Sequence, residues 1–441
     1  MNLIPEQSDP ESCRRAAQEH ARRGEPVRAE EQFQRLLETQ PRDLEALQFL
    51  ANRHHQRGNF EQALSLLAAA ADADHEIPAI ALQRGAVELS MGNFRAAVVS
   101  IEHGLQKAPG AFAARLQLGI ALEQVGEHEK ALRTYFQAIN AAQQQGRWLN
   151  DATTAPSLRG PVRYAITYVQ QGRGRLFHAA LDPLRERYGT DALVRVEESL
   201  AVYLGLREAE IPDARQRPTF FYFKGIPSQP YYPRSRFPWA DELEQATHAV
   251  REELDAVLRQ NLELEAFLGS RDRAATANLL QGSSGREPVW DAFFFYRHGK
   301  RHDENCERCP ATAALLAGLP LVKVRDHAPE TLFSVLKPGT HILPHRGVTN
   351  TRLVTHLPLI IPSDCALRVG GEIHAWQAGR CVTFDDTFEH EAWNRSDETR
   401  VVLILDSWNP DLSEVERIAV TDLVETIGDF NEASESSPAW A

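Results

Sequence analysis

The chain has 441 residues, of which 43% are hydrophobic and 25% are charged, a composition typical of a globular protein with two or three domains. Its net charge of −13 argues against non-specific binding to nucleic acid or membrane surfaces, because their phosphates would repel it. We find no signal peptide and no apolar run of about 18 residues, and five cysteines are too few to cross-link a chain of this length. These features predict a reduced, cytoplasmic protein that binds neither nucleic acid nor membrane.

A repeat of 34 residues occupies the N-terminal third. The repeat is marked by four glycines, each followed five residues later by an alanine: Gly24 and Ala29, Gly58 and Ala63, Gly92 and Ala97, Gly126 and Ala131. Glycine suits the turn between two helices, and alanine suits a close helix crossing. The pattern resembles the tetratricopeptide repeat and predicts four helical hairpins over residues 11–145. Such arrays bind peptides or proteins on a concave face, and a purely structural or dimerising solenoid is the alternative.

The segments that follow predict a capping region and then a second domain. Residues 146–216 keep helical spacing and are expected to continue and cap the array. From 217 the composition becomes aromatic and proline-rich, which indicates a domain that extends to 427. We expect an amphipathic helix over 240–260, a second helix near 262–270 and a strand over 289–296. The tail, 428–441, is polar and is expected to be disordered.

An isolated CxxC sequence, formed by Cys306 and Cys309, lies between these elements. Zinc sites normally need a second pair of ligands at suitable spacing, and none follows. We therefore interpret the pair as a turn with a buried cysteine.

Short strand-like runs then alternate with turns from 321 to 406. They are LVKVR, LFSVL, RLVTHLPLII, ALRVG, EIHAW, CVTF and RVVLILD, separated by Gly, Pro and Asn. Closely spaced antiparallel strands of this kind predict a sandwich or a jelly-roll barrel. The fold class expected is therefore α+β and multidomain, with an all-α solenoid followed by a jelly roll.

The alternation of side chains along these strands indicates an anion site. In RLVTHLPLII, Arg352 and His356 share one face, while the opposite face is almost wholly apolar and is expected to pack on helices or on the other sheet. Ser334 and Arg400 lie on comparable faces of their own strands. A buried arginine is costly unless it meets an anion, so these residues predict a site for a small dianion.

Two further histidines suggest a metal. His345 and His390 are 45 residues apart, and each lies where a strand meets a turn at the mouth of the predicted barrel. A lone histidine is more often structural, but a pair in this setting favours metal binding. Imidazole suits several transition metals, so the residue type alone does not fix which one.

The sequences FSVLKPGTHILPHRGVTNTRLVTHLPLIIP and FDDTFEHEAWNRSDETRVVLILDSWNP resemble the aspartyl/asparaginyl β-hydroxylase family over roughly 217–425. The resemblance implies a double-stranded β-helix oxygenase that uses iron(II), 2-oxoglutarate and O2, with release of succinate and carbon dioxide. It implies that His345 and His390 bind iron, and that no other catalytic residue acts beyond the metal centre. It further implies that Arg400 and Ser334 bind the distal carboxylate of 2-oxoglutarate, and that His356 contacts the end nearer the metal. Arg352 would lie near both co-substrate and substrate.

Two positions depart from what is usual. Most oxygenases of this fold have a carboxylate two residues after the first histidine, whereas this chain has Gly347, a departure that the β-hydroxylase family shares. Asp385 or Asp386 is a possible replacement ligand, and the alternative is that both are hydrogen-bonding residues at the rim. Val354 stands where animal members of the family carry a second arginine, which leaves specificity for an acidic substrate open.

We weigh three functions. The first is hydroxylation of an Asp, Asn or other residue in a peptide or protein presented by the repeats. The second is the same chemistry on a small molecule, free amino acid or lipid, with the repeats serving assembly. The third is a non-catalytic scaffold, which the retained histidines and Arg400 argue against. The oligomeric state does not follow from the sequence.

Overall fold

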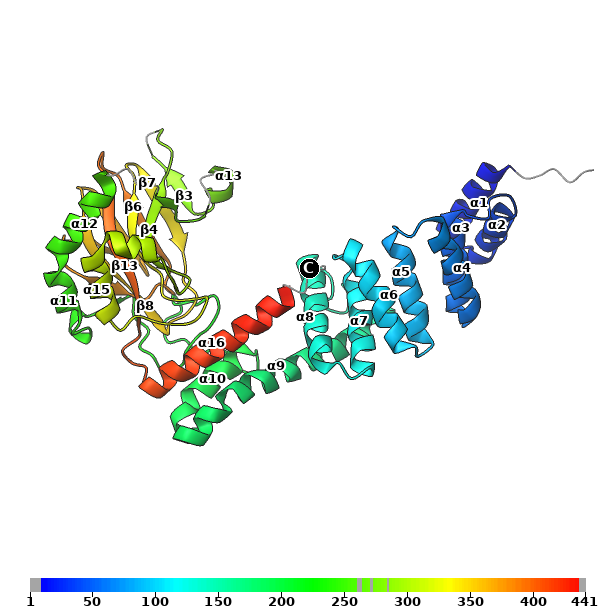
Figure 1. The fold of residues 1–441 in the computed structure, drawn as a ribbon, viewed down its shortest axis with the longest axis horizontal. Coiled ribbons are helices and arrows are strands. Elements are labelled where there is room, and N and C mark those ends of the chain that lie inside the picture. The colour runs from blue at the N-terminus through cyan, green and yellow to red at the C-terminus, as the bar shows by residue number, and fades with distance from the viewer. Residues whose placement is uncertain (1–8, 260–263, 270–272, 284, 436–441) are drawn as a thin grey trace, which may run out of the picture. The chain divides into compact units, whose positions relative to one another are not determined.

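The structure is a computed structural model that describes residues 9–259, 264–269, 273–283 and 285–435. Its internal contacts divide the chain into two compact units. The first contains residues up to 175 together with those from 429, and the second contains residues 176–428 (Figure 1). Within the part of the chain that is described, no helix has the length and apolar character needed to cross a membrane.

Helical hairpins build the first unit. They pair α1 (Pro10–Arg22) with α2 (Pro26–Thr39), α3 (Leu44–Gln56) with α4 (Phe60–Ala73), α5 (Pro78–Ser90) with α6 (Phe94–Lys107), and α7 (Phe112–Gln124) with α8 (His128–Gln144). The four repeat glycines lie in the turns with φ between +73° and +86°, the left-handed region that glycine adopts without strain. The four repeat alanines are fully buried at the helix crossings. The predicted tetratricopeptide-like array is therefore confirmed.

Helices continue after the repeats. They are η1 (Pro156–Leu158), α9 (Arg159–Tyr188), η2 (Thr190–Leu193) and α10 (Val194–Tyr203), and a last helix, α16 (Glu414–Glu435), ends the described chain.

The prediction of a disordered tail is wrong for residues 428–435, which belong to α16, and 436–441 lie outside the described residues. The apolar stripe of this helix does not stop at 428, because Phe430 is buried and its ring centroid lies 5.1 Å from that of Phe136, with the two rings tilted.

The second unit contains two antiparallel sheets and short helices. Its strands are β1 (Tyr231–Tyr232), β2 (Glu265–Ala266), β3 (Leu280–Gly282), β4 (Trp290–Arg297), β5 (Lys300–Arg301), β6 (Thr331–Leu336), β7 (Thr340–His345), β8 (Arg352–Ile360), β9 (Cys365–Val369), β10 (Glu372–His374), β11 (Val382–Phe384), β12 (His390–Asn394) and β13 (Arg400–Trp408). Its remaining helices are η3 (Arg234–Arg236), α11 (Ala240–Gln245), α12 (Thr247–Arg259), α13 (Arg273–Thr276), α14 (Asp303–Arg308) and α15 (Pro310–Gly318).

The chain alternates between the two sheets from β6 onward. The larger sheet has the order β1-β11-β8-β13-β6-β4-β2, with β5 paired to β4, and the smaller has the order β10-β9-β12-β7-β3. Successive strands β6, β7, β8 and β9 thus fall in alternate sheets, and β11, β12 and β13 do the same. The predicted class, a helical array followed by an antiparallel β domain, is confirmed.

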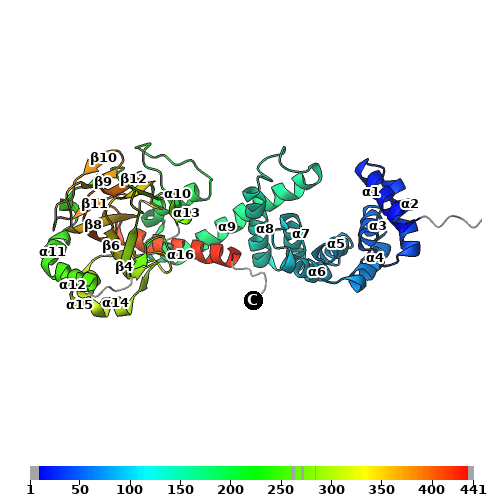
Figure 2. The same cartoon turned by 90° about the horizontal axis from the view of Figure 1, so that it is seen from above.

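Helices cover one face of the larger sheet. Side chains of α11, α12 and α15 form a core with alternate residues of β4, β6, β8 and β13, including Leu357 and Leu359 of β8. Figure 2 shows α11, α12 and α15 together beside β8, β6 and β4. The apolar face of β8 therefore packs on helices, one of the two outcomes expected. Its other face, with Arg352, Val354 and His356, is turned to the interior between the sheets.

Three local predictions need correction. Residues 264–269 form β2 and a turn rather than a helix, and the neighbouring 262–263 and 270 lie outside the described residues. The run 321–325 is not a strand but makes isolated bridges at Leu321 and Val324. Strands β7 and β12 were missed because they are short and mix histidine, proline and charged residues with few apolar ones. Cys306 and Cys309 are buried and unpaired, as expected, but Cys306 lies within helix α14 rather than in a turn, and Cys309 lies between α14 and α15.

Candidate active site

A cavity of about 270 Å³ between the sheets contains all six residues predicted for the site. They are Ser334, His345, Arg352, His356, His390 and Arg400. The rest of its lining is mostly apolar: Phe267, Trp290, Leu332, Ile342, Val354, Leu367, Phe384, Ala392 and Ile404, with Glu330, Gly347, Asp386 and Asp406. The tertiary structure thus brings together residues separated by up to 66 positions in the sequence, whereas their individual roles remain predictions.

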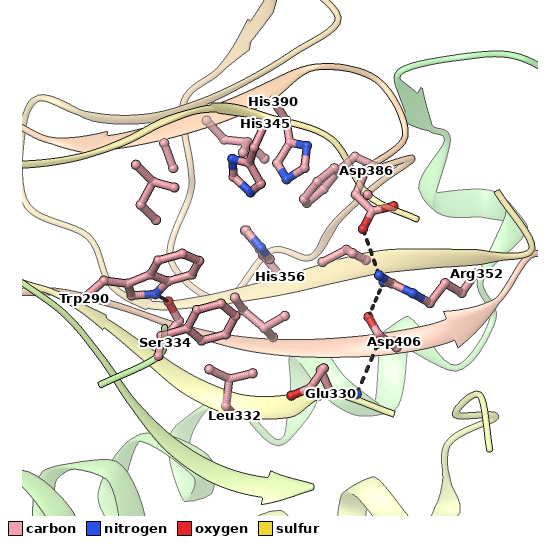
Figure 3. A pocket seen from close by; sticks show the side chains of 18 of the residues that line it. Trp290, Glu330, Leu332, Ser334, His345, Arg352, His356, Asp386, His390 and Asp406 are labelled. Carbon is pink, nitrogen blue, oxygen red and sulfur yellow. Dashed lines mark hydrogen bonds and ion pairs between the residues drawn. The ribbon is translucent and has the colours of Figure 1, made fainter. Parts of the chain in front are cut away.

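The two histidines face each other across neighbouring strands. His345 ends β7, His390 begins β12, the two are register partners, and their ring centroids are 4.1 Å apart (Figure 3). His345 Nδ1 lies 2.8 Å from the carbonyl oxygen of Leu343, and His390 Nδ1 lies 3.1 Å from that of Phe388. An Nδ1–H that donates to a carbonyl leaves the Nε2 lone pair available to a metal. Burial, followed by the neighbouring His345, lowers the pKa of His390 to about 4, so its ring is neutral, as a metal ligand must be.

Asp386 occupies the space that a side chain at position 347 would need. A Cβ on Gly347 would lie 2.1 Å from Cγ and from Oδ1 of Asp386, so only glycine fits here. Asp386 is buried, and its Oδ1 has no hydrogen-bond partner. Asp385, by contrast, does not line the cavity, and its carboxylate accepts hydrogen bonds from Thr387 and Gln216.

Of the two candidate carboxylates, Asp386 is therefore the one that faces the histidines. Among the described residues no group of three His, Cys, Asp or Glu side chains is arranged to hold a metal. The imidazoles of His345 and His390, with a free carboxylate oxygen nearby, nevertheless form a donor set that suits iron(II), with open positions left for other ligands.

Arg400 forms the cationic end of the cavity. Its side chain is 1% exposed, and it has no acidic partner among the described residues. Nη1 reaches Ser334 Oγ at 3.3 Å, the guanidinium lies 4.9 Å from the Trp376 ring centroid, and Nε has no partner. Burial lowers the pKa of Arg400 to about 10, which still leaves it charged at neutral pH. A buried cation without a carboxylate is the arrangement expected of an anion site.

Ser334 is oriented by two donors. Its Oγ accepts a hydrogen bond from Trp290 Nε1 at 2.9 Å as well as from Arg400. With both acceptor positions used, the hydroxyl hydrogen is directed elsewhere and can be donated to a ligand. Sequence analysis placed Trp290 in the strand expected over 289–296 but gave it no contact with Ser334, and its position two β-pairs away from Ser334 in the register of β4 and β6 is visible only in the fold.

His356 lies near the cationic end and is neutral. Burial first, and the Arg400 charge second, lower the pKa of His356 well below its ordinary value. Its Nδ1 is buried without a partner. A neutral imidazole with an unused nitrogen beside an arginine can hydrogen-bond a carboxylate when Nδ1 carries the proton.

Arg352 is already paired. Its Nη1 lies 2.9 Å from Asp406 Oδ1 and its Nη2 lies 3.0 Å from Asp386 Oδ2 (Figure 3). Although burial opposes the charged form, Asp386 and Asp406 hold the pKa of Arg352 above its ordinary value. Arg352 lines the cavity as predicted, but its guanidinium is already bound to Asp386, which it holds in place, and is not free to bind a ligand.

Comparison with known proteins adds to this geometry. A sequence model of the aspartyl/asparaginyl beta-hydroxylase family matches residues 244–410. The human protein named aspartyl/asparaginyl beta-hydroxylase is 25% identical over 340 residues, 74% of this chain and 42% of its own length. The ornithine lipid ester-linked acyl 2-hydroxylase of Rhizobium tropici is 36% identical over 41% of this chain and 61% of its own. Aspartate beta-hydroxylase domain-containing protein 2 of Rattus norvegicus is 30% identical over 56% of this chain and 69% of its own.

The chain therefore spans less than two thirds of the human and Rhizobium proteins and more than two thirds of the rat one. The family match covers every strand of the two sheets except β1, and every residue of the cavity, which confirms the resemblance seen in the sequence. This chain belongs to the aspartyl/asparaginyl β-hydroxylase family.

Proposed function

We propose that this protein is an iron(II)- and 2-oxoglutarate-dependent oxygenase that hydroxylates an unactivated carbon. The observation that carries the proposal is Arg400, a buried cation without an acidic partner in the same cavity as two histidines with free Nε2 atoms. Iron(II) bound with 2-oxoglutarate and O2 would supply the chemistry that converts a substrate C–H bond to C–OH and releases succinate and carbon dioxide. The alternation of β6–β9, and again of β11–β13, between two sheets is the strand order expected of a double-stranded β-helix.

The chain's own residues would bind the metal and 2-oxoglutarate, orient them, and shield them from bulk water. His345 and His390 would hold the metal through Nε2, and the Asp386 carboxylate would lie beside them in the cavity lining. Arg400 and the Ser334 hydroxyl would pair with the distal carboxylate of 2-oxoglutarate, and His356 would contact its other end. Arg352 would keep Asp386 in position. The apolar walls would exclude bulk water and so strengthen these polar contacts.

The first substrate candidate is a residue of a peptide or protein. The helical unit offers a groove of about 440 Å³ between α4, α5 and α6, with Val99 exposed in it, and helical arrays of this kind commonly bind peptides. The repeats would then present the target residue to the cavity.

The second candidate is an acyl chain or other small molecule. Val354 and the largely apolar lining of the cavity suit a hydrocarbon, and the Rhizobium tropici relative bears the name of an acyl 2-hydroxylase. In this case the repeats would serve assembly only.

The reaction class is tested by succinate formation. Full-length protein incubated with iron(II), 2-oxoglutarate and O2 is expected to form succinate, whereas His390→Ala is expected to lose both succinate formation and bound iron measured by elemental analysis. His248→Ala, which changes an exposed histidine on α12, is the matched control and should retain both. Full turnover by His390→Ala would end the assignment of this site.

The substrate class is tested by mass spectrometry and a groove variant. The added oxygen is located in peptides or in acyl chains of material treated with the enzyme. If the repeats present the substrate, Val99→Glu lowers turnover of a protein substrate, while Val27→Glu, an equally exposed position on α2 outside the groove, does not. Equal turnover by both variants would favour the acyl candidate.

A further inference from the structure

The end of the cavity away from Arg400 is rich in carboxylates. Glu330, Asp386 and Asp406 all line it, and Arg352 is the cation that lies among them (Figure 3). Arg352 uses one nitrogen for Asp406 and the other for Asp386, so its two strong hydrogen-bonding edges are occupied. Two of the three carboxylates therefore pair with the one guanidinium, and acidic groups outnumber cations at this end of the cavity.

Glu330 is the carboxylate that Arg352 does not bind. The backbone N–H of His298 donates to its Oε1 at 2.7 Å, and His298 Nδ1 lies 2.9 Å from the same oxygen. Burial, with Arg297 and other cations nearby, lowers the pKa of His298, so this ring is a neutral partner at pH 7. No lysine or arginine forms an ion pair with Glu330 in the described residues. The second oxygen, Oε2, makes no hydrogen bond or ion pair within the described part of the chain, and the Glu330 side chain is 25% exposed.

A second observation also points to a ligand here. Asp386 is 5% exposed and lines the cavity, and its Oδ1 has no hydrogen-bond partner. A buried carboxylate oxygen in this state is costly unless a donor binds it. The walls between these carboxylates and the rest of the cavity are apolar, from Phe267, Leu332 and Ile404.

We propose that the molecule hydroxylated in this cavity carries a protonated amine on an alkyl chain, held by the Glu330 carboxylate at the acidic end. This inference rests on the proposed function and adds the substrate's charge to it. The ammonium group would donate to Glu330, and the alkyl chain would lie against Leu332 and Ile404. An arginine at position 354 would attract a substrate carboxylate. Val354 is neutral, so it adds no positive charge to the acidic end of the cavity.

The burial of Glu330 supports the same conclusion. Burial raises the pKa of Glu330 to about 7, and the nearby Asp406 adds to this effect. A carboxylate in this condition gains a favourable partner when a cation binds, because the cation stabilises its charged form. An acidic substrate would meet repulsion from the same group.

The test compares three probes that differ only at one end: n-hexylamine, hexan-1-ol and hexanoate. Each is titrated calorimetrically into full-length protein with excess 2-oxoglutarate, which fills the Arg400 end if the proposed function holds. The amine is expected to bind about tenfold more tightly than the alcohol, and hexanoate most weakly. Glu330→Gln, of nearly equal shape, is expected to reduce the amine preference to within about twofold.

Glu304→Gln provides the matched control, because it removes one exposed carboxylate on α14 outside the cavity. It should keep the full preference for the amine. Equal affinity for the three probes, including no measurable binding of any, would overturn the proposal, as would an amine preference that survives Glu330→Gln. An ornithine-containing peptide and N-octanoyl-ornithine then distinguish the source of the amine, since the tighter binder identifies a peptide or a lipid.

Failure of this inference is distinguishable from failure of the proposed function. Succinate formation without any amine preference would refute the amine site and leave the oxygenase intact. An amine preference without succinate formation from any substrate would refute the oxygenase and leave the amine site intact.

Discussion

Arg352 and Arg400 line the same cavity from neighbouring strands, β8 and β13, and differ in what surrounds them. Arg352 makes ion pairs with two buried aspartates, whereas Arg400 meets a serine, a tryptophan face and no carboxylate. The Arg352 side chain is 17% exposed and Arg400 is buried, and both lie on strand faces turned to the cavity, so residue type and spacing do not separate them. A paired arginine orders its neighbours, and an unpaired one requires an anion from outside.

The largest expected effect is on the free energy of unfolding, and it comes from replacing Arg352, the arginine that makes ion pairs. Arg352→Met leaves Asp386 and Asp406 buried without their cation, and removal of one partner from such a network costs about 3–5 kcal/mol. We expect a corresponding loss in the free energy of unfolding, measured by urea denaturation of the full chain. Stability equal to the wild type would show that Arg352 does not hold these carboxylates, and the contrast with Arg400 would fail.

Arg400→Met is expected to weaken 2-oxoglutarate binding without a loss of stability. It removes a buried cation that has no acidic partner, so we expect no loss of thermal stability. Affinity for 2-oxoglutarate, measured by calorimetry, is expected to fall by about 2–5 kcal/mol, the usual effect of removing one member of a buried charge pair. Unchanged affinity for 2-oxoglutarate would place the co-substrate elsewhere.

Ser334→Ala tests how much one hydroxyl contributes to 2-oxoglutarate binding at the Arg400 end of the cavity. The loss of a neutral hydroxyl that donates to a carboxylate is expected to weaken 2-oxoglutarate binding by about 1.5 kcal/mol, roughly tenfold. Ser407→Ala, which removes a hydroxyl outside the cavity lining on β13, is the control and should leave the affinity unchanged. A loss in Ser407→Ala as large as that in Ser334→Ala would mean that the effect is not local.

The smallest effect concerns the pH dependence of stability at Glu330. Its pKa in the folded protein is about 7, raised by burial from an ordinary value of 4.5, in surroundings that contain Asp406, Arg297, His298 and Arg352. Because the folded state favours the protonated carboxyl, this contribution to stability is fully present below pH 4.5 and is lost as the pH rises through 7.

Glu330→Gln keeps a neutral group at every pH, so it should match the wild type at pH 4.5 and exceed it at pH 8. We expect a gain of about 1 kcal/mol at pH 8, or roughly 2–4 °C in Tm by calorimetry. A difference in Tm that is the same at both pH values would contradict the raised pKa.

Much of the fold could be read from the sequence because it rests on local rules. The 34-residue spacing of Gly58 and its counterparts gives helical hairpins, since glycine alone enters the left-handed region without strain. The alternation in β8 places Leu357 on one face and His356 on the other whatever the sheet around it. Strands β7 and β12 escaped detection because their histidines and proline interrupt this alternation, and these are the strands that carry the two candidate metal ligands.

The sequence by itself determined which side chains turn inward from β6, β8 and β13, and with them Ser334, His356 and both arginines of the cavity. Only the tertiary structure decided how these side chains are paired. Asp386 reaches Arg352 across 34 positions and fills the space beside Gly347, while Arg400 is left without a carboxylate. The physical reason is that orientation along a strand is a property of the local backbone, whereas the charge that faces a buried group depends on which distant strands lie beside it.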